Sequence, residues 1–448
     1  MTKEKQNDAI YDARQLGAGR MFVLGLQHMF AMFGATVLVP LITGLSVSAT
    51  LLFAGIGTLL FHLLTKRKVP AFLGSSFAFL GGYAAVSTMC AEAGVEHFSA
   101  YAGVGVACAG LLYVLLSILF KVFGANKVMR YFPPIVTGPI IIAIGLILSS
   151  SAIANCNANW WIALVAIFVV IACNIWGKGM IKIVPILLGV VVSYIVAAAT
   201  KNVDFTAVKE AAWIGIPFKF EDTAFSLFKG ADASLIITSI ITIMPIALAT
   251  IIEHIGDISA ISSTVGKNYI QDPGLHRTLL GDGLATSLAA LFGAPANTTY
   301  GENTGVLALS RVYDPKVVRI AAVLAILFSF SPKFAALINS MPTATVGGVS
   351  LILYGMISAV GVRNVVENQV DFTKSRNVII AALILVLSIG INYSEMGAVT
   401  FMVGSATISL SGLAVAALVG IILNAVLPGK DYEFGKNQQG ETSVNFKV

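Results

Sequence analysis

Apolar stretches alternate with short polar connections along almost the whole chain. Most stretches reach the roughly 17–25 residues that a helix needs to cross a bilayer, and they lack the strict alternation of a barrel strand. A backbone in lipid must satisfy its own hydrogen bonds, so each stretch predicts a transmembrane helix. Together the stretches predict an all-α polytopic membrane protein. About fourteen segments are predicted: 20–43, 48–64, 74–91, 100–120, 133–151, 159–176, 181–200, 234–258, 278–293, 300–311, 317–339, 344–361, 377–393 and 406–427.

The composition agrees with this pattern. Only 11% of the residues are charged and 57% are hydrophobic, with a mean hydropathy of +0.87. Soluble proteins carry about 25% charged residues, so most of this surface must face a lipid bilayer. The first residues are polar and no small-residue cleavage site follows them, so no signal peptide is expected. The four cysteines lack metal-ligand spacing, and we expect no metal site.

Lys and Arg are concentrated on alternate loops. All but five of the 28 lie in loops or tails that would share one side of the membrane, whereas the short loops on the other side hold none. The positive-inside rule then places both termini in the cytoplasm. The net charge of +6 is therefore a topology signal, and no nucleic-acid partner is expected. The five exceptions are Lys201, Lys209, Lys219, Lys229 and Lys333.

A polar connecting segment divides the chain into two halves of seven predicted spans. The predicted parts are a cytoplasmic tail (1–19), a first repeat (20–200), an extracellular or periplasmic connection (201–233), a second repeat (234–427) and a cytoplasmic tail (428–448). An odd number of spans in each half forces the halves into opposite orientations. This is the inverted repeat that is typical of secondary transporters.

Two short strings in the first half recur in the second. Gly74–Phe77 corresponds to Asn297–Tyr300, each with two hydroxyl residues before an aromatic, and Pro134–Gly138 corresponds to Pro342–Gly347. The first pair is too polar for lipid-facing helix, and a non-helical backbone survives in a membrane only inside protein or beside a cavity. We expect two discontinuous spans, each a short strand that pairs with the other and then opens a half-helix. Close helix packing through small residues is the alternative.

Three carboxylates fall in or beside these breaks. Glu253 and Asp257 are four residues apart and share one helical face, and Glu302 follows the second polar string. A charged carboxylate deep in a bilayer is costly, and no Lys or Arg is predicted at a similar depth in a neighbouring span. Hydrogen bonds to a ligand, or a raised pKa with protonation, are the remaining ways to satisfy them. These properties favour a proton-coupled binding site, with half-helix N–H groups for ligand carbonyls.

Five motifs resemble the nucleobase–cation symporters, also called nucleobase–ascorbate transporters, and their uracil permease branch most closely. The motifs are Gln27–Pro40, Leu73–Phe79, Glu253–Asp257, Asp272–Arg277 and Asn297–Asn303. The likeness covers roughly residues 20–427. It implies fourteen spans in two inverted repeats, a core bundle and a gate bundle, and a homodimer in the bacterial inner membrane. It also implies inward uracil:proton symport by alternating access, with the proton as coupling ion and no cofactor.

The same resemblance implies roles for individual residues. Substrate binding falls to Glu253, Glu302, Phe77, Gly301, Ser76 and Tyr300, proton coupling to Glu253, Asp257 and Glu302, gating to Tyr354, and support behind the site to His28, His254 and Asn303. Purine members of the family have Gln in place of Glu302, which favours uracil here. Asp257 stands where some uracil permeases have His, so the resemblance implies no fixed role for this side chain, and a water-mediated or proton-relay role is expected of it.

Three other functions are compatible with parts of the sequence. A purine permease for xanthine or uric acid would have the same fold. An anion transporter similar to the sulfate-permease group would share the architecture, but two acids in the site argue against it. A membrane-embedded enzyme is disfavoured because the sequence shows no metal-ligand cluster, catalytic triad spacing or phosphate loop.

Overall fold

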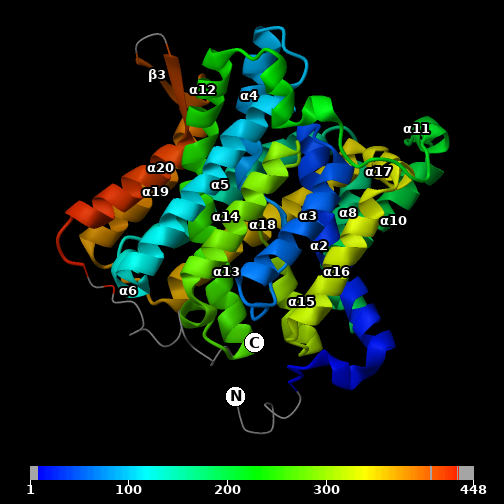
Figure 1. Cartoon of the computed structure of the whole chain (residues 1–448), viewed down its shortest axis with the longest axis horizontal. Coiled ribbons are helices and arrows are strands. Elements are labelled where there is room, and N and C mark those ends of the chain that lie inside the picture. Colours follow the sequence, from blue (N-terminus) through cyan, green and yellow to red (C-terminus); the bar gives the residue numbers. More distant parts are fainter. Residues whose placement is uncertain (1–8, 404–405, 431, 433–448) are drawn as a thin grey trace.

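The computed structural model describes residues 9–403, 406–430 and 432, with only the backbone at Glu302, 402–403 and 406–409 among a few other positions. Residues 1–8 and 433–448 of the predicted tails lie outside the described residues. The described chain is a bundle of helices (Figure 1). The helices are α2 (Gly17–Thr43), α3 (Val47–Leu64), α4 (Leu80–Glu92), α5 (Phe98–Phe123), α6 (Ala125–Met129), α7 (Pro134–Cys156), α8 (Trp160–Ile175), α9 (Met180–Ile183), α10 (Pro185–Ala199), α11 (Thr206–Glu210), α12 (Ala233–Ile243), α13 (Ala247–Val265), α14 (Leu275–Leu291), α15 (Glu302–Ser310), α16 (Pro315–Ser329), α17 (Pro332–Asn339), α18 (Thr343–Glu367), α19 (Ser375–Asn392) and α20 (Gly412–Val426). The strands are β1 (Leu73–Ser75), β2 (Asn297–Thr299), β3 (Ala398–Val403) and β4 (Ala406–Ser411).

The helices confirm a multi-pass helical membrane protein. Within the described residues, seven helical stretches are long and apolar enough to cross a bilayer, and α8, α10 and α20 are shorter apolar helices. Each of the fourteen predicted segments contains at least one helix.

Two predicted segments differ from simple spans. The 317–339 segment bends by 89° between α16 and α17. Pro332 forces the bend because its ring removes a backbone donor and the preceding residue is held extended, and Ser331 caps the new helix through Phe334 N at 3.3 Å. The 406–427 segment begins as strand β4, which pairs with β3, and becomes helical only at Gly412.

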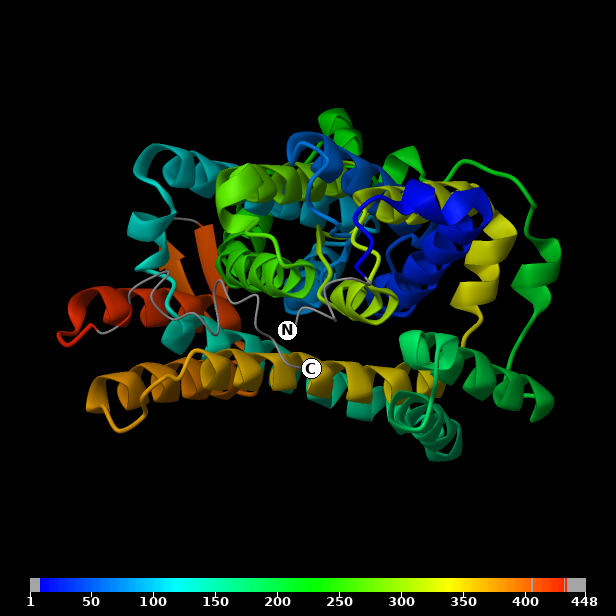
Figure 2. The same ribbon diagram turned by 90° about the horizontal axis from the view of Figure 1, so that it is seen from below.

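The helices form two layers (Figure 2). One layer contains α2, α3, α5, α14 and α16, which pack on one another, and the other contains α7, α18 and α19 with α8 and α10. These layers correspond to the predicted core and gate bundles. The α17 helix lies between α16 of the first layer and α18 of the second in the chain, so it links the two.

The recurring Pro134–Gly138 and Pro342–Gly347 strings open the two gate helices α7 and α18, which pack closely together. Added Cβ atoms show how tight this contact is. On Gly145 of α7 a Cβ would lie 2.2 Å from the backbone oxygen of Tyr354, and on Gly361 of α18 it would lie 2.6 Å from the nitrogen of Ile142. Small residues thus let the two backbones approach, as in membrane helix pairs generally.

Loops that were predicted to share a membrane face contact one another. Ile10 bridges to Val312, and Tyr11 donates its hydroxyl to the oxygen of Val265 at 2.8 Å. Lys68 pairs with Asp272, and the ammonium group lowers the pKa of that carboxyl.

Loops predicted on the opposite face form a second set of contacts. Ser46 donates to the oxygen of Pro217 at 3.4 Å, and Ser99 donates to Asp222 at 3.2 Å. No loop has to cross the bundle to make these contacts, so they agree with the charge pattern.

Candidate substrate-binding site

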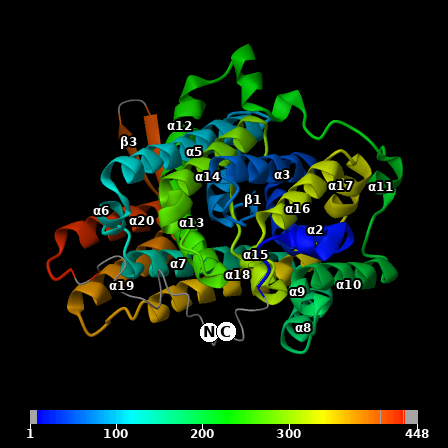
Figure 3. The same ribbon diagram turned by 60° about the horizontal axis from the view of Figure 1, so that its bottom comes forward.

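The two predicted breaks meet inside the bundle as a short antiparallel pair of strands. β1 pairs with β2 in the register Leu73–Thr299, Gly74–Thr298 and Ser75–Asn297. The pairing satisfies backbone groups that no water could reach in a membrane. Figure 3 shows β1 near the middle of the molecule, with α3, α14 and α15 around it. The predicted pairing of the two extended segments is confirmed.

Backbone hydrogen bonds continue beyond both strands. Ser76 N donates to the oxygen of Ala296 at 2.9 Å, and Tyr300 N donates to the oxygen of Phe72 at 2.9 Å. A short 3-10 turn, Phe77–Phe79, then leads into α4, while α15 follows β2 directly. Each strand is therefore followed by a short helix whose first N–H groups have no acceptor within the helix. We call the strand pair and the two helix starts the crossing.

Side chains lock the two strands together. The Tyr300 hydroxyl donates to the oxygen of Ser75 at 2.7 Å, and Ser75 Oγ donates to the oxygen of Thr36 in α2 at 2.9 Å. Gly74 has no room for a side chain, because a Cβ would lie 2.6 Å from the Tyr300 ring. Asn297 Nδ2 donates to the oxygen of Phe53 in α3 at 2.8 Å. The crossing is thereby tied to α2 and α3.

The acidic face of α13 lies against β2. Glu253 and Asp257 are both half-buried, and Thr299 Oγ1 donates to Asp257 Oδ2 at 3.3 Å. A Cβ on Gly301 would lie 2.9 Å from Asp257 Oδ1, so the start of α15 also reaches this carboxylate. The structure thus brings Asp257 close to Gly301, the residue directly before the first residue of α15. For Glu302 only the backbone is described, as the first residue of α15.

A fourth carboxylate, Asp282 of α14, was missed in the sequence. It is fully buried, and its Oδ2 lies beside Nδ1 of the buried His254. Thr299 connects this pair to β2: its Oγ1 lies 3.1 Å from His254 Nδ1, and its N donates to Asp282 Oδ2 at 3.3 Å. Phe61 and Tyr113 set their rings edge-on to the imidazole at 6.4 Å. His254 therefore lies behind the crossing, on the side of β2 where α14 packs.

The signal for Asp282 was present in the sequence. It is an acid between two glycines inside the apolar segment 278–293, and intramembrane acids mark functional sites by default. An inspection of every acid within a predicted span would have found it. Thr299 belongs to the second polar string, and its hydroxyl joins Asp257 to the His254–Asp282 pair.

The predicted gate residue contacts the predicted binding residue of the first break. The rings of Tyr354 in α18 and Phe77 lie 5.5 Å apart with their planes at 77°, and both side chains are buried. This edge-to-face contact joins the gate layer to the crossing. Ser76 is also buried, directly before the 3-10 turn.

Two other predicted residues are buried polar groups with unfilled hydrogen-bonding capacity. Neither ring nitrogen of His28 and neither amide atom of Asn303 has a hydrogen-bond partner among the described residues. His28 lies in α2 and Asn303 in α15, and these two helices pack against each other. Buried polar groups are normally hydrogen-bonded, so this helix pair has the capacity to hold a polar ligand or water.

Apolar helices that enclose two paired strand-to-helix breaks, beside acidic side chains, define a class: the multi-pass membrane transporters. Residues 19–397 match the sequence model of a protein family that is described as the permease family, and the chain belongs to that family. The chain is 42% identical to the uracil permease of Bacillus caldolyticus, over 92% of this chain and 93% of that protein. It is 38% identical to the uracil permease of Bacillus subtilis (strain 168), over the full length of both.

A solved structure shows the same fold. The transmembrane domain of a cyanobacterium bicarbonate transporter, BicA, is similar with a TM-score of 0.62 at 16% identity, covering 93% of this chain and 99% of that one. The family match confirms the resemblance that the motifs indicated. The protein is accordingly a transporter rather than an enzyme.

Proposed function

We propose that this protein carries uracil into the cell together with a proton, by exposing one site alternately to the two sides of the membrane. The observation that carries the proposal is the placement of the acidic face of α13 against the crossing, where Asp257 contacts both Thr299 and the start of α15. Relatives named uracil permeases, at 38–42% identity over nearly the whole chain, support the choice of substrate.

Uracil complements the groups around the crossing. It is a planar ring with two N–H donors and two carbonyl acceptors. In the proposal, Glu253 and Glu302 accept the N–H groups, while the backbone N–H groups of Phe77 and Gly301 donate to the carbonyls. An unmatched buried donor or acceptor costs about 1–3 kcal/mol, so rings without this pattern should bind weakly. Ser76 and Tyr300 would line the site, and Tyr354 would close it.

The proton would reside on the carboxylates of α13. Glu253 and Asp257 lie on one helical face, and two nearby negative charges favour protonation of at least one of them. A neutral substrate with one proton carries positive charge inward, so membrane potential as well as a pH gradient would drive uptake. Glu302 would contribute mainly to binding.

Asp282 and His254 would position the site rather than touch the substrate. Their contacts with Thr299 fix β2 from behind, and Thr299 passes this restraint to Asp257. In this arrangement, protonation of Asp257 would change the hydrogen bond that Thr299 donates. The crossing would then sense the proton through a single side chain.

The proposal includes a membrane topology. The protein would have two inverted seven-span repeats, 20–200 and 234–427, joined by an external segment, with both termini in the cytoplasm of a bacterial cell and two copies forming a homodimer. The antiparallel pairing of β1 with β2 supports the repeats, since each half supplies one broken segment. The two sets of loop contacts support the sidedness.

Radiolabelled uracil uptake into proteoliposomes tests the proposal. Uptake should exceed equilibrium when the outside is more acidic than the lumen, and should fall to equilibrium when an ionophore collapses the gradient. Unlabelled uracil should compete and xanthine should not. Uptake that ignored the pH gradient would refute proton coupling, and competition by xanthine would favour a purine permease.

A further inference from the structure

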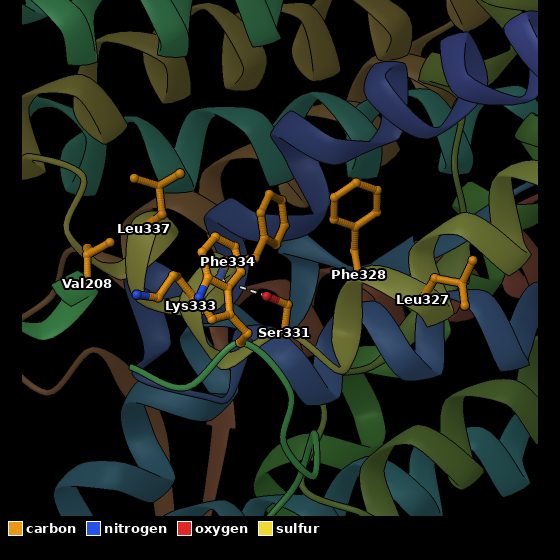
Figure 4. Close-up of a pocket in the computed structure, with 8 residues that line it drawn as sticks. Val208, Leu327, Phe328, Ser331, Lys333, Phe334 and Leu337 are labelled. Atoms are coloured by element: carbon orange, nitrogen blue, oxygen red, sulfur yellow. Dashed lines mark hydrogen bonds between the residues drawn. The ribbon is translucent and has the colours of Figure 1, made fainter. Parts of the chain in front are cut away.

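A cavity of about 460 Å³ lies away from the crossing, where α16 turns into α17. The connecting segment between the halves forms its opposite wall. Its size falls in the range of about 300–1,000 Å³ that is typical of small-molecule sites. The lining residues are Val208, Trp213, Leu327, Phe328, Ser331, Lys333, Phe334 and Leu337 (Figure 4).

The wall of the cavity is apolar and held in place. Phe334 packs on Phe328 with ring centroids 4.9 Å apart, and on Phe33 of the core helix α2 at 5.5 Å. The hydroxyl of Ser331 accepts a hydrogen bond from Phe334 N, so this polar group already has a partner. Leu327 and Trp213 are 63% and 75% exposed, which leaves an apolar entrance.

Lys333 supplies the one charge among the lining residues of this cavity. Its Nζ lies 5.0 Å from the centroid of the Trp213 ring and 3.4 Å from the oxygen of Lys209. An ammonium group has three donors, and these contacts use one of them with a long hydrogen bond. Its backbone is fixed because Lys333 N donates to Ala212 at 2.9 Å. An anion can therefore approach Nζ without displacing the helix.

We propose that this cavity binds one anionic phospholipid, with an acyl chain on the apolar wall and the phosphate beside Lys333 Nζ. The apolar wall of the cavity suits the hydrocarbon part of such a lipid, and the single ammonium group suits its negatively charged head group. A lysine whose ammonium group only reaches towards water would not need an apolar cavity beside it. Because α17 connects α16 of one layer to α18 of the other, a bound lipid would contact the link between the layers. The proposal does not depend on the transported substrate.

Fluorescence of Trp213 tests this site directly. The chain has four tryptophans, so a variant with Trp160→Phe, Trp161→Phe and Trp176→Phe leaves Trp213 as the sole reporter. The full-length variant is reconstituted in vesicles with lipids that carry brominated, quenching acyl chains. Brominated phosphatidylglycerol should quench at about one fifth of the mole fraction that brominated phosphatidylcholine needs, since a membrane-proximal lysine contributes about 1 kcal/mol of attraction.

Three substitutions in this background decide the role of Lys333. Lys333→Gln should remove the preference for phosphatidylglycerol, Lys333→Arg should keep it, and Lys219→Gln, at an exposed lysine of the same connecting segment, should leave it unchanged. Equal quenching by both lipids in the single-tryptophan variant that retains Lys333 would overturn the proposal. A preference for phosphatidylglycerol that survives Lys333→Gln would also overturn it. Stronger quenching by a brominated free fatty acid than by phosphatidylglycerol would also overturn it.

Discussion

In the first broken segment, β1 passes through a 3-10 turn into α4; in the second, β2 passes directly into α15. The two backbones are alike and are held in one strand pair. Their charges differ. The α4 helix has one acid, Glu92, exposed at its far end, whereas α15 begins with Glu302 and faces the acids of α13.

The two segments therefore share a backbone shape but differ in the chemical groups that surround them. The first segment offers backbone N–H groups and the aromatic contact of Phe77 with Tyr354. The second is surrounded by carboxylates and by the His254–Asp282 pair. In our account the first segment holds and gates the substrate, and the second binds its N–H groups and takes the proton.

Glu253→Gln should abolish uracil accumulation. The amide cannot take the coupling proton, and loss of a charged hydrogen bond costs about 1.5–3 kcal/mol, or at least about tenfold in affinity. Uptake into proteoliposomes under a pH gradient measures the effect. Glu92→Gln, which removes the acid of the first segment, should transport normally; equal loss in both variants would contradict the division.

Asp282→Asn should chiefly reduce stability. It breaks a fully buried pair with His254, and removing one partner of such a pair costs about 3–5 kcal/mol. Thermal unfolding in detergent should show a clearly lower midpoint than for Glu210→Gln, an exposed acid of the connecting segment. An unchanged midpoint would mean that the pair does not support β2.

Gly301→Ala should weaken uracil binding. The added methyl would lie 2.9 Å from Asp257 Oδ1, and overpacking costs about 1–3 kcal/mol, or at least about fivefold in affinity. Gly305→Ala is the matched control on the same helix, because a Cβ there meets nothing within 4 Å. Calorimetric titration compares the two, and equal affinities would show that the start of α15 is not tightly fitted.

Phe77→Leu should have the smallest effect. It removes an edge-to-face contact with Tyr354 that is worth about 0.5–1.5 kcal/mol, so the uptake rate should fall a few-fold with little change in proton dependence. A lost response to the pH gradient in this variant would place coupling in the first segment and reverse the division.

Much of the fold followed from the sequence because hydrophobic length alone limits what a membrane protein can do. Hydropathy located a helix in each of the fourteen segments, and polarity located both breaks. The bend before Pro332 and strand β4 were missed. Both lie inside apolar segments, and the mean hydropathy of a segment does not distinguish a straight helix from a bent helix or a strand.

The site was predicted less completely than the fold. Asp257 and Gly301 were both named from sequence motifs, and the structure brings them together. Thr299, which donates to Asp257, was not named as a site residue. Asp282 could have been noticed as an acid inside an apolar segment, but its pairing with His254 depends on how α13 packs against α14. Long-range pairing of this kind is a property of the packed bundle, and one chain read in order does not reveal it.

Proton uptake on binding is the most direct test of the acidic site. Uracil is titrated into the purified protein near neutral pH in buffers of different ionisation enthalpy, and the dependence of the measured heat on that enthalpy gives the number of protons taken up. The account predicts uptake that approaches about one proton for the native chain and none for Glu253→Gln. Uracil binding with no proton uptake by the native chain at any pH would contradict it.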